Sequence, residues 1–112
     1  MLDVTKENRF TVIKPTMANL DSHVAADFKS AFSKQLDNDP DFVLLDLSNV
    51  NFMDSSGLAA IVFCFQMVDI KDKLSICGVN DRVMKLFTLT QMGKVLHIFP
   101  TKENAMSVLS DD

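Results

Sequence analysis

The chain has 112 residues, of which 47% are hydrophobic and 23% are charged, with a net charge of −4. This length predicts one domain, spanning residues 1–112, with its own hydrophobic core. Lysine and arginine are scattered without a basic run, which argues against a nucleic-acid-binding protein. The longest apolar run, around Leu58 to Phe65, is too short to span a bilayer, and the N-terminus lacks a signal-peptide pattern. We therefore expect a cytoplasmic protein without membrane insertion.

The first part of the chain predicts a hairpin and then an amphipathic helix. Residues 2–6 and 9–14 alternate weakly between apolar and polar side chains around a turn at Glu7-Asn8, and Pro15 ends the second strand. Residues 16–19 form a loop, after which Asp21 or Ser22 can cap a helix. The stripe of this helix repeats every four residues. Its members are Leu20, Val24, Phe28, Phe32 and Leu36.

The middle of the chain predicts a buried strand that leads into a second helix. Residues 42–47 form a short, nearly continuous apolar run. After a connector at 48–53, a helix is expected from about Ser56 to Lys71, and its apolar residues occupy two faces. One face holds Leu58, Ile61, Val62, Phe65 and Val68, and the other holds Ala59, Ala60, Phe63, Met67 and Ile70. Either the domain covers both faces, or Phe63 and Met67 are partly exposed and contribute to a partner surface.

The last part of the chain alternates between short strands and helices. Residues 74–77 form a strand closed by Gly78, and a third helix is capped by Asn80 or Asp81 and stopped by Gly93. A strand at 95–99 precedes a short helix that Thr101 caps, with Ala105, Val108 and Leu109 on one side. The order ββαβαβαβα predicts an α/β domain with a mixed, mostly parallel sheet of about five strands and four helices.

Residues with catalytic or metal-binding potential are few. No Walker loop, G-x-G-x-x-G motif or His/Cys metal spacing is present, so we expect no cofactor. A hydrolase would need Ser55 or Ser56 with His23 as the base, but neither serine lies in a G-x-S-x-G elbow. Three carboxylates, those of Asp21, Asp46 and Asp54, could converge at one end of the sheet, although caps and surface charges explain them better. Cys64 and Cys77 fall inside apolar segments, which favours buried free thiols in a reducing compartment.

The tetrapeptide Asp54-Ser55-Ser56-Gly57 has two interpretations from physical chemistry alone. Asp54 or Ser55 can be a helix N-cap, with Gly57 as a small residue in the first turn. Alternatively, one serine is a phosphorylation site, because a helix N-terminus tolerates negative charge. A phosphate there would add ~1.5 to 2 negative charges beside Asp54. This reasoning does not choose between Ser55 and Ser56.

The segment from Phe42 to Leu58, FVLLDLSNVNFMDSSGL, resembles the central signature of STAS domains, in particular of bacterial anti-sigma factor antagonists. In that family an apolar strand leads through a Phe-Met/Leu-Asp-Ser-Ser-Gly-Leu turn into a helix. Three further matches are Leu20-Asp21 before the first helix, the Val-x-x-Leu-Phe pattern at 83–87, and Met92-Gly93. The resemblance covers essentially the whole chain and implies a single STAS domain.

The resemblance also implies a function and its partners. The unphosphorylated protein would bind a serine-kinase anti-sigma factor of GHKL type, and phosphorylation at Ser55 would inactivate it until a PP2C-type phosphatase restored it. ATP would be the kinase's cofactor, and this chain would not be an enzyme. The expected partner-binding residues are Asp21, Ser22, Asp54, Ser55, Ser56, Gly57, Ala59, Ala60, Phe63 and Met67. A weak homodimer is a further expectation.

One position departs from the family pattern. Ala18 stands where the family often has glycine, in the loop expected beside the serines. Because this loop is commonly part of the partner surface, the change bears on the identity of the partner. The same fold also serves as a subunit of lipid-transport complexes and of phosphorelays whose output is not a sigma factor. A regulatory or scaffold role of that kind is the alternative function.

Overall fold

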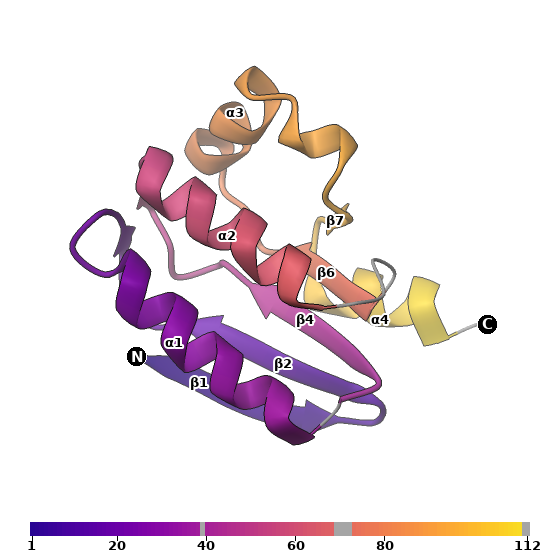
Figure 1. Ribbon diagram of the computed structural model, residues 1–112. Coiled ribbons are helices and arrows are strands. Elements are labelled where there is room, and N and C mark those ends of the chain that lie inside the picture. Colours follow the sequence, from indigo (N-terminus) through magenta and orange to yellow (C-terminus); the bar gives the residue numbers. More distant parts are fainter. Residues whose placement is uncertain (39, 69–72, 111–112) are drawn as a thin grey trace.

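A five-stranded sheet forms the centre of the computed structural model, which describes residues 1–38, 40–68 and 73–110 (Figure 1). The strand order is β1-β2-β4-β6-β7. β1 pairs antiparallel with β2, and the remaining pairs are parallel. The mixed, mostly parallel sheet predicted from the sequence is thereby confirmed. Its strands are β1 (Leu2–Glu7), β2 (Phe10–Pro15), β4 (Phe42–Asp46), β6 (Leu74–Cys77) and β7 (Ile98–Phe99).

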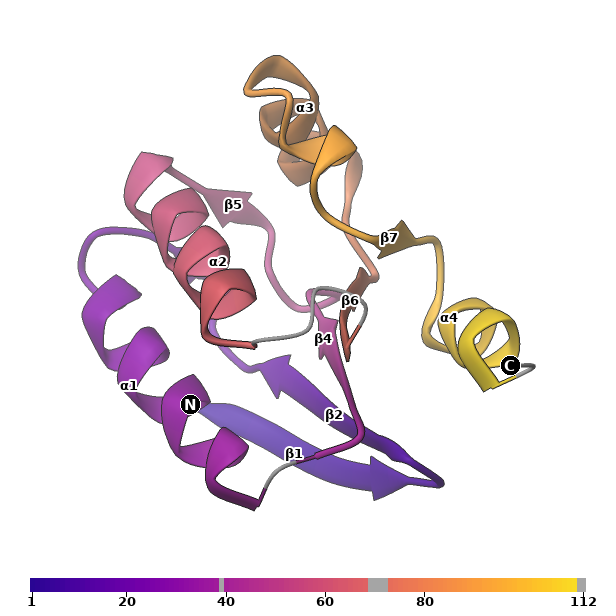
Figure 2. The same cartoon turned by 45° about the vertical axis from the view of Figure 1, so that its right-hand side comes forward.

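Helices cover both faces of the sheet, and the described residues form four α-helices, as predicted. Three of them, α1 (Ala25–Gln35), α2 (Ser55–Met67) and α3 (Asp81–Leu89), pack on one face, whereas α4 (Lys102–Ser110) packs on the other (Figures 1 and 2). Each face has its own core. The larger core includes Phe28, Phe32, Ile61 and Phe87, and the smaller one includes Phe10, Leu44 and Ala105.

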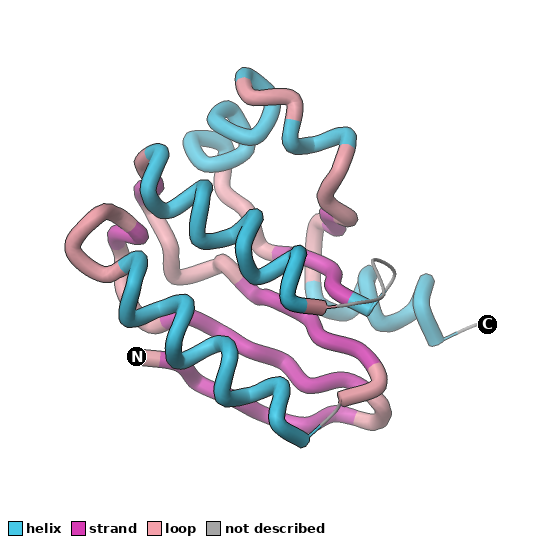
Figure 3. Tube along the Cα trace, in the orientation of Figure 1, coloured by secondary structure: helices cyan, strands magenta, loops and turns pink. Residues whose placement is uncertain are grey.

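A second, very small sheet was not predicted. It consists of β3 (Asn19–Leu20) and β5 (Phe52–Met53), which pair in parallel. β5 falls in the predicted connector at 48–53, whereas β3 joins the end of the predicted loop to Leu20, which was expected to belong to the first helix. Figure 3 shows the strands and helices as they are formed. Two-residue strands are too short for hydrophobic periodicity to reveal them.

The hairpin and several helix ends follow the predictions closely. β2 ends at Pro15, although the turn lies at Asn8-Arg9 and Asn8 adopts a φ of 57°. The side chain of Asn80 caps α3, accepting from the N–H of Val83 at 2.8 Å. Thr101 caps α4 through its hydroxyl, which accepts from the N–H of Asn104 at 3.0 Å.

Some predicted boundaries are wrong. Asp21 and Ser22 do not cap α1, which begins at Ala25 after a turn in which Oδ1 of Asp21 accepts from the N–H of His23. α3 ends before Gly93, because Gln91 takes the left-handed conformation with a φ of 63°. The strand predicted at 95–99 is shorter than expected, because only β7 (Ile98–Phe99) forms. The short helix η3 (Met92–Lys94) precedes it.

One helix exposes a residue that was expected on its apolar side, and another ends early. On α4, Val108 is 53% exposed, although the sequence places it on one side with Ala105 and Leu109. The second helix ends at Met67, earlier than expected, and Ile70 lies outside the described residues. Helix ends are set by tertiary contacts that a single-sequence pattern does not contain.

Both cysteines are buried and free, as the sequence indicates. Cys64 belongs to the larger core and Cys77 to the smaller one. Burial raises the pKa of each thiol to about 12, because the charged thiolate is poorly solvated there. Both thiols are therefore uncharged at neutral pH and act as apolar packing groups.

Candidate functional site

The tetrapeptide at 54–57 lies where β5 passes into α2. Asp54 is the N-cap of the helix, and its Oδ1 accepts from the N–H of Gly57 at 3.0 Å. The helix therefore starts at Ser55, one residue earlier than predicted. A capped start satisfies one of the free N–H groups of the first turn and fixes the direction of the helix.

The loop before α1 is joined to this helix start by backbone pairing. The carbonyl of Ala18 accepts from the N–H of Asn51 at 2.7 Å and of Phe52 at 3.2 Å. The carbonyl of Leu20 accepts from the N–H of Asp54 at 3.4 Å. These bonds hold the predicted loop beside the serines even though Ala18 replaces the glycine that the family often has.

The second carboxylate oxygen of Asp54 adds a tie to the same loop. Oδ2 accepts from the N–H of Ser22 at 3.3 Å, while Oδ1 caps α2. One side chain thus bridges two segments 32 residues apart in the sequence. Asp21, Ser22 and Asp54, predicted as members of one site, are brought together by these contacts.

The two serines differ in accessibility. Ser55 is exposed and Ser56 is half-buried. Ser55 is also the first helical residue, where backbone N–H groups have no intrahelical acceptor. An enzyme could therefore reach the Ser55 hydroxyl, and the helix terminus would stabilise negative charge on it.

Gly57 and Ala60 do not lie on the surface predicted to bind a partner. Gly57 is buried, and a Cβ there would overlap the carbonyl oxygen of Leu20 and lie 2.8 Å from Cγ of Met53. Ala60 is 1% exposed and belongs to the larger core. The need for close packing against β3 explains the glycine, and burial removes both residues from the candidate surface.

The exposed side of α2 carries an apolar strip. Ala59 is exposed, Phe63 is 42% exposed, and Met67 is half-buried against the larger core. Lys29 of α1 places its Nζ 5.1 Å from the centre of the Phe63 ring. The domain therefore covers one face of α2 and leaves part of the other open. The partial exposure of Phe63 and Met67 is confirmed, while their role in a partner surface stays a prediction.

Phe52 is an exposed aromatic residue close in sequence to the serines, and the sequence analysis did not single it out. It is 40% exposed on β5, three residues before Ser55. Within a segment taken as a connector, its aromatic side chain gave no periodic signal of exposure. Its position adds a second exposed aromatic residue near the serines.

His23 lies beside Asp21, whereas Asp46 makes a separate contact. The side chain of His23 is 89% exposed, and its Nδ1 lies 3.7 Å from Oδ1 of Asp21. Asp46 is engaged elsewhere, since its Oδ1 accepts from the N–H of Ser48 at 3.0 Å. Within residues 1–38, 40–68 and 73–110, no three His, Cys, Asp or Glu side chains could hold a metal ion together.

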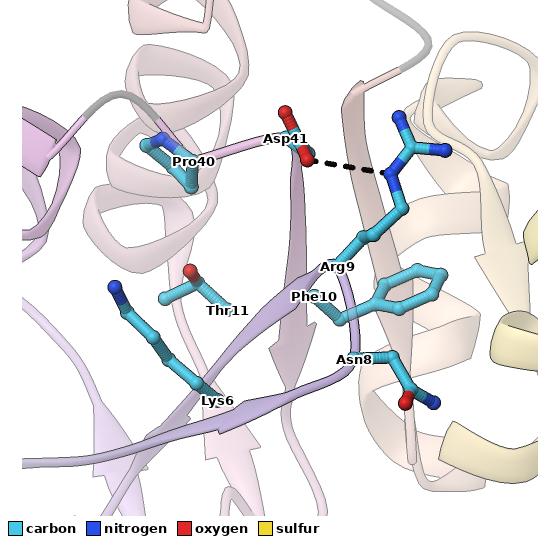
Figure 4. Close-up of a pocket in the computed structure, with 7 residues that line it drawn as sticks. All are labelled: Lys6, Asn8, Arg9, Phe10, Thr11, Pro40 and Asp41. Atoms are coloured by element: carbon cyan, nitrogen blue, oxygen red, sulfur yellow. Dashed lines mark hydrogen bonds and ion pairs between the residues drawn. The ribbon is translucent and has the colours of Figure 1, made fainter.

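A cavity of about 210 Å³ lies at the tip of the β1-β2 hairpin (Figure 4). Arg9 on its rim donates from Nε to Asp41 Oδ2 at 3.3 Å and lies over the ring of Phe42. The Arg9 and Asp41 side chains are both mostly exposed. Their charges therefore compensate each other in an open setting, which differs from a ligand site where several buried polar groups converge.

Across the described ranges, no helix is both long and apolar enough to cross a membrane.

Comparisons with known proteins agree on one family. The family model of the STAS domain matches residues 1–105. A protein from Paenibacillus polymyxa named anti-sigma F factor antagonist is 32% identical over 68 residues, which cover 60% of this chain and 58% of that protein. A Staphylococcus aureus protein named anti-sigma-B factor antagonist is 26% identical over 98 residues, covering 87% of this chain and 90% of its own.

Solved structures share the fold at lower identity. The crystal structure of an anti-sigma factor antagonist from Mycobacterium paratuberculosis has a TM-score of 0.89 at 19% identity, covering 99% of this chain and 94% of its own. SpoIIAA, a Bacillus cell fate determinant solved in its phosphorylated form, has a TM-score of 0.68 at 17% identity and covers 97% of this chain and 99% of its own.

The close contact at Gly57 generates a prediction about stability. We expect Gly57→Ala to lower the free energy of unfolding by about 1–3 kcal/mol, because the added methyl group overpacks the junction of β3 and α2. The measurement is urea denaturation followed by circular dichroism. Gly93→Ala is the matched control, since a Cβ there meets no atom within 4 Å, and it should change stability by less than about 0.5 kcal/mol. Equal effects of the two substitutions would contradict the close contact.

Proposed function

This chain belongs to the STAS domain family, and we propose that it acts as an anti-sigma factor antagonist controlled by phosphorylation of Ser55. In its unphosphorylated form it binds an anti-sigma factor, which releases the sigma factor. The observation that carries the proposal is an exposed serine at a capped helix start, beside a partly exposed apolar strip. The names of the two relatives support the same role.

The partner in this proposal is an anti-sigma factor that is itself a serine kinase of GHKL type. It phosphorylates Ser55 with ATP as its own cofactor, and a PP2C-type phosphatase removes the phosphate. The chain itself is proposed not to be an enzyme and to work in the cytoplasm, where its partners act on transcription. His23 gives little support to a serine hydrolase, because it is directed to Asp21 and solvent.

The proposed partner surface follows one face of α2. Ser55, Ala59 and Phe63 recur at intervals of four residues, so they lie on the same side of the helix. All three are exposed. Asp21 and Ser22 extend this surface on the loop side, Phe52 extends it on β5, and Met67 extends it at the far end of the helix.

Phosphorylation would act on this surface without disturbing the fold. Asp54 already accepts from the N–H of Gly57 in the first turn. The other N–H groups at the helix start favour an added phosphate. A partner that buries Ser55 would have to desolvate that phosphate beside the carboxylate of Asp54. A loss of ~2.7 kcal/mol reduces affinity about a hundredfold, which is enough for a switch.

The modified residue can be identified directly. We expect incubation with the cognate kinase and ATP to add one phosphate, on Ser55, because its hydroxyl is exposed whereas that of Ser56 is half-buried. Tandem mass spectrometry locates the phosphate. Ser55→Ala should abolish the modification and Ser56→Ala should keep it. Phosphate found only on another residue would refute the assignment.

A charge at Ser55 should weaken partner binding. We expect Ser55→Asp to reduce the affinity for the proposed anti-sigma factor, which binds the unphosphorylated chain, by at least about tenfold, or ~1.4 kcal/mol. The reason is that the new carboxylate must be desolvated at the interface. Isothermal titration calorimetry measures the affinity, and the urea midpoint should stay near that of wild type. Ser55→Ala serves as the uncharged control and should bind normally. Equal affinity of the aspartate variant and wild type would exclude a charge switch.

The exposed ring on α2 should contribute to the same interface. We expect Phe63→Ser to weaken partner binding about tenfold, or ~1.4 kcal/mol, because aromatic anchors commonly dominate interface energy. Met67→Ser should have a smaller effect, since that side chain is half-buried. Val108→Ser on α4 is the control, because Val108 is 53% exposed on the helix that covers the opposite sheet face. If Phe63→Ser and Val108→Ser bind equally well, the α2 strip is not the interface.

A further inference from the structure

Asn80 makes more hydrogen bonds than a helix cap requires. Its Oδ1 accepts from the N–H of Val83 at 2.8 Å, which caps α3. Its Nδ2 donates to the carbonyls of Val50 and Asn51, each at 3.2 Å. The side chain thus links the start of α3 to the connector that runs into β5 and Ser55.

Capping alone does not explain an amide at this position. Aspartate and serine cap helices about as well as asparagine, and an aspartate would interact more favourably with the helix dipole. Of these residues only asparagine has an N–H₂ group that can donate to two carbonyls while its oxygen caps a helix. The residue type therefore matches the bridge and not only the cap.

The bridge reaches the phosphorylation turn through a short backbone path. Asn51 is held on both sides, since its carbonyl accepts from Asn80 and its N–H donates to Ala18 at 2.7 Å. Two residues of β5 follow, and then Asp54 caps α2. The backbone between Asn51 and Ser55 is therefore held by hydrogen bonds to Asn80 on one side and to the loop before α1 on the other.

We propose that Asn80 is a positioning residue, which fixes the turn carrying Ser55 against α3. Its importance for phosphorylation rests on the function proposed above, whereas its effect on the geometry of the turn does not. Because it acts through the backbone, its loss should slow transfer to a misplaced hydroxyl while leaving docking on α2 intact. The expected kinetic signature is a lower kcat with an unchanged KM.

The test uses the full chain with Asn80→Asp, which keeps the cap acceptor and removes both amide donors. Amide hydrogen exchange by NMR should become about tenfold faster at Asn51, Phe52 and Asp54, whose N–H groups donate to the loop before α1, while the N–H of Val83 stays protected. Asn80→Ser also keeps a cap acceptor without adding charge, and it should reproduce the effect. This separates the missing donors from carboxylate–carbonyl repulsion.

Thr101→Ala is the matched control, because it removes the cap of α4, which covers the other face of the sheet. It reports what a general loss of stability does to exchange near Ser55, and it should leave that exchange unchanged. In parallel, kinase assays should give an about tenfold lower kcat for Asn80→Asp and wild-type values for Thr101→Ala.

Two results would overturn the inference. One is wild-type exchange at Asn51, Phe52 and Asp54 in both Asn80 variants, and the other is an equal acceleration in Thr101→Ala. If the kinase does not modify wild-type Ser55, the proposed function fails instead, and the exchange experiment still decides whether Asn80 holds the turn.

Discussion

The carboxylate of Asp54 is the contact on which the arrangement of the site depends. Its two oxygens accept from two backbone N–H groups, one in α2 and one in the loop before α1. A carboxylate with such donors serves as a cap and as a cross-link at once. The start of α2 is thereby fixed relative to a segment that is distant in the sequence, and Ser55 is presented outward from a defined position.

Two further constraints work together with Asp54. The pairing of β3 with β5 supplies backbone bonds just before Asp54 and at its own N–H, and Gly57 allows the helix to approach the carbonyl of Leu20 closely. Any side chain at position 57 would push the helix away from β3. The motif Asp-Ser-Ser-Gly therefore combines a structural pair, Asp54 and Gly57, with a pair of hydroxyls whose exposure differs.

The sequence predicts the main sheet and the four helices because most of their segments carry an apolar run or a recognisable period and have ordinary lengths. It does not predict β3 and β5, since a strand of two residues shows no period. Nor does it predict that Asp54 joins α2 to the loop before α1. Asp21 and Gly93 were assigned by residue type to a cap and a stop, but Asp21 turns the chain earlier and Gln91 adopts the left-handed conformation. Burial of Ala60 and exposure of Phe63 are decided by the packing of α1 and α2, which a helical period alone does not fix.

The spacing along α2 explains how a charge and an apolar strip can act on one partner. Ser55 and Phe63 are eight residues apart on the same side of the helix, which corresponds to about 12 Å at ~1.5 Å per residue. A specific interface buries roughly 800 Å² on each partner and is therefore wider than this distance. A partner that covers Phe63 along this helix thus also approaches Ser55 and excludes water from it. Because the attraction at Phe63 and the penalty at a phosphorylated Ser55 fall within one contact area, the charge can oppose binding without any movement of the helix.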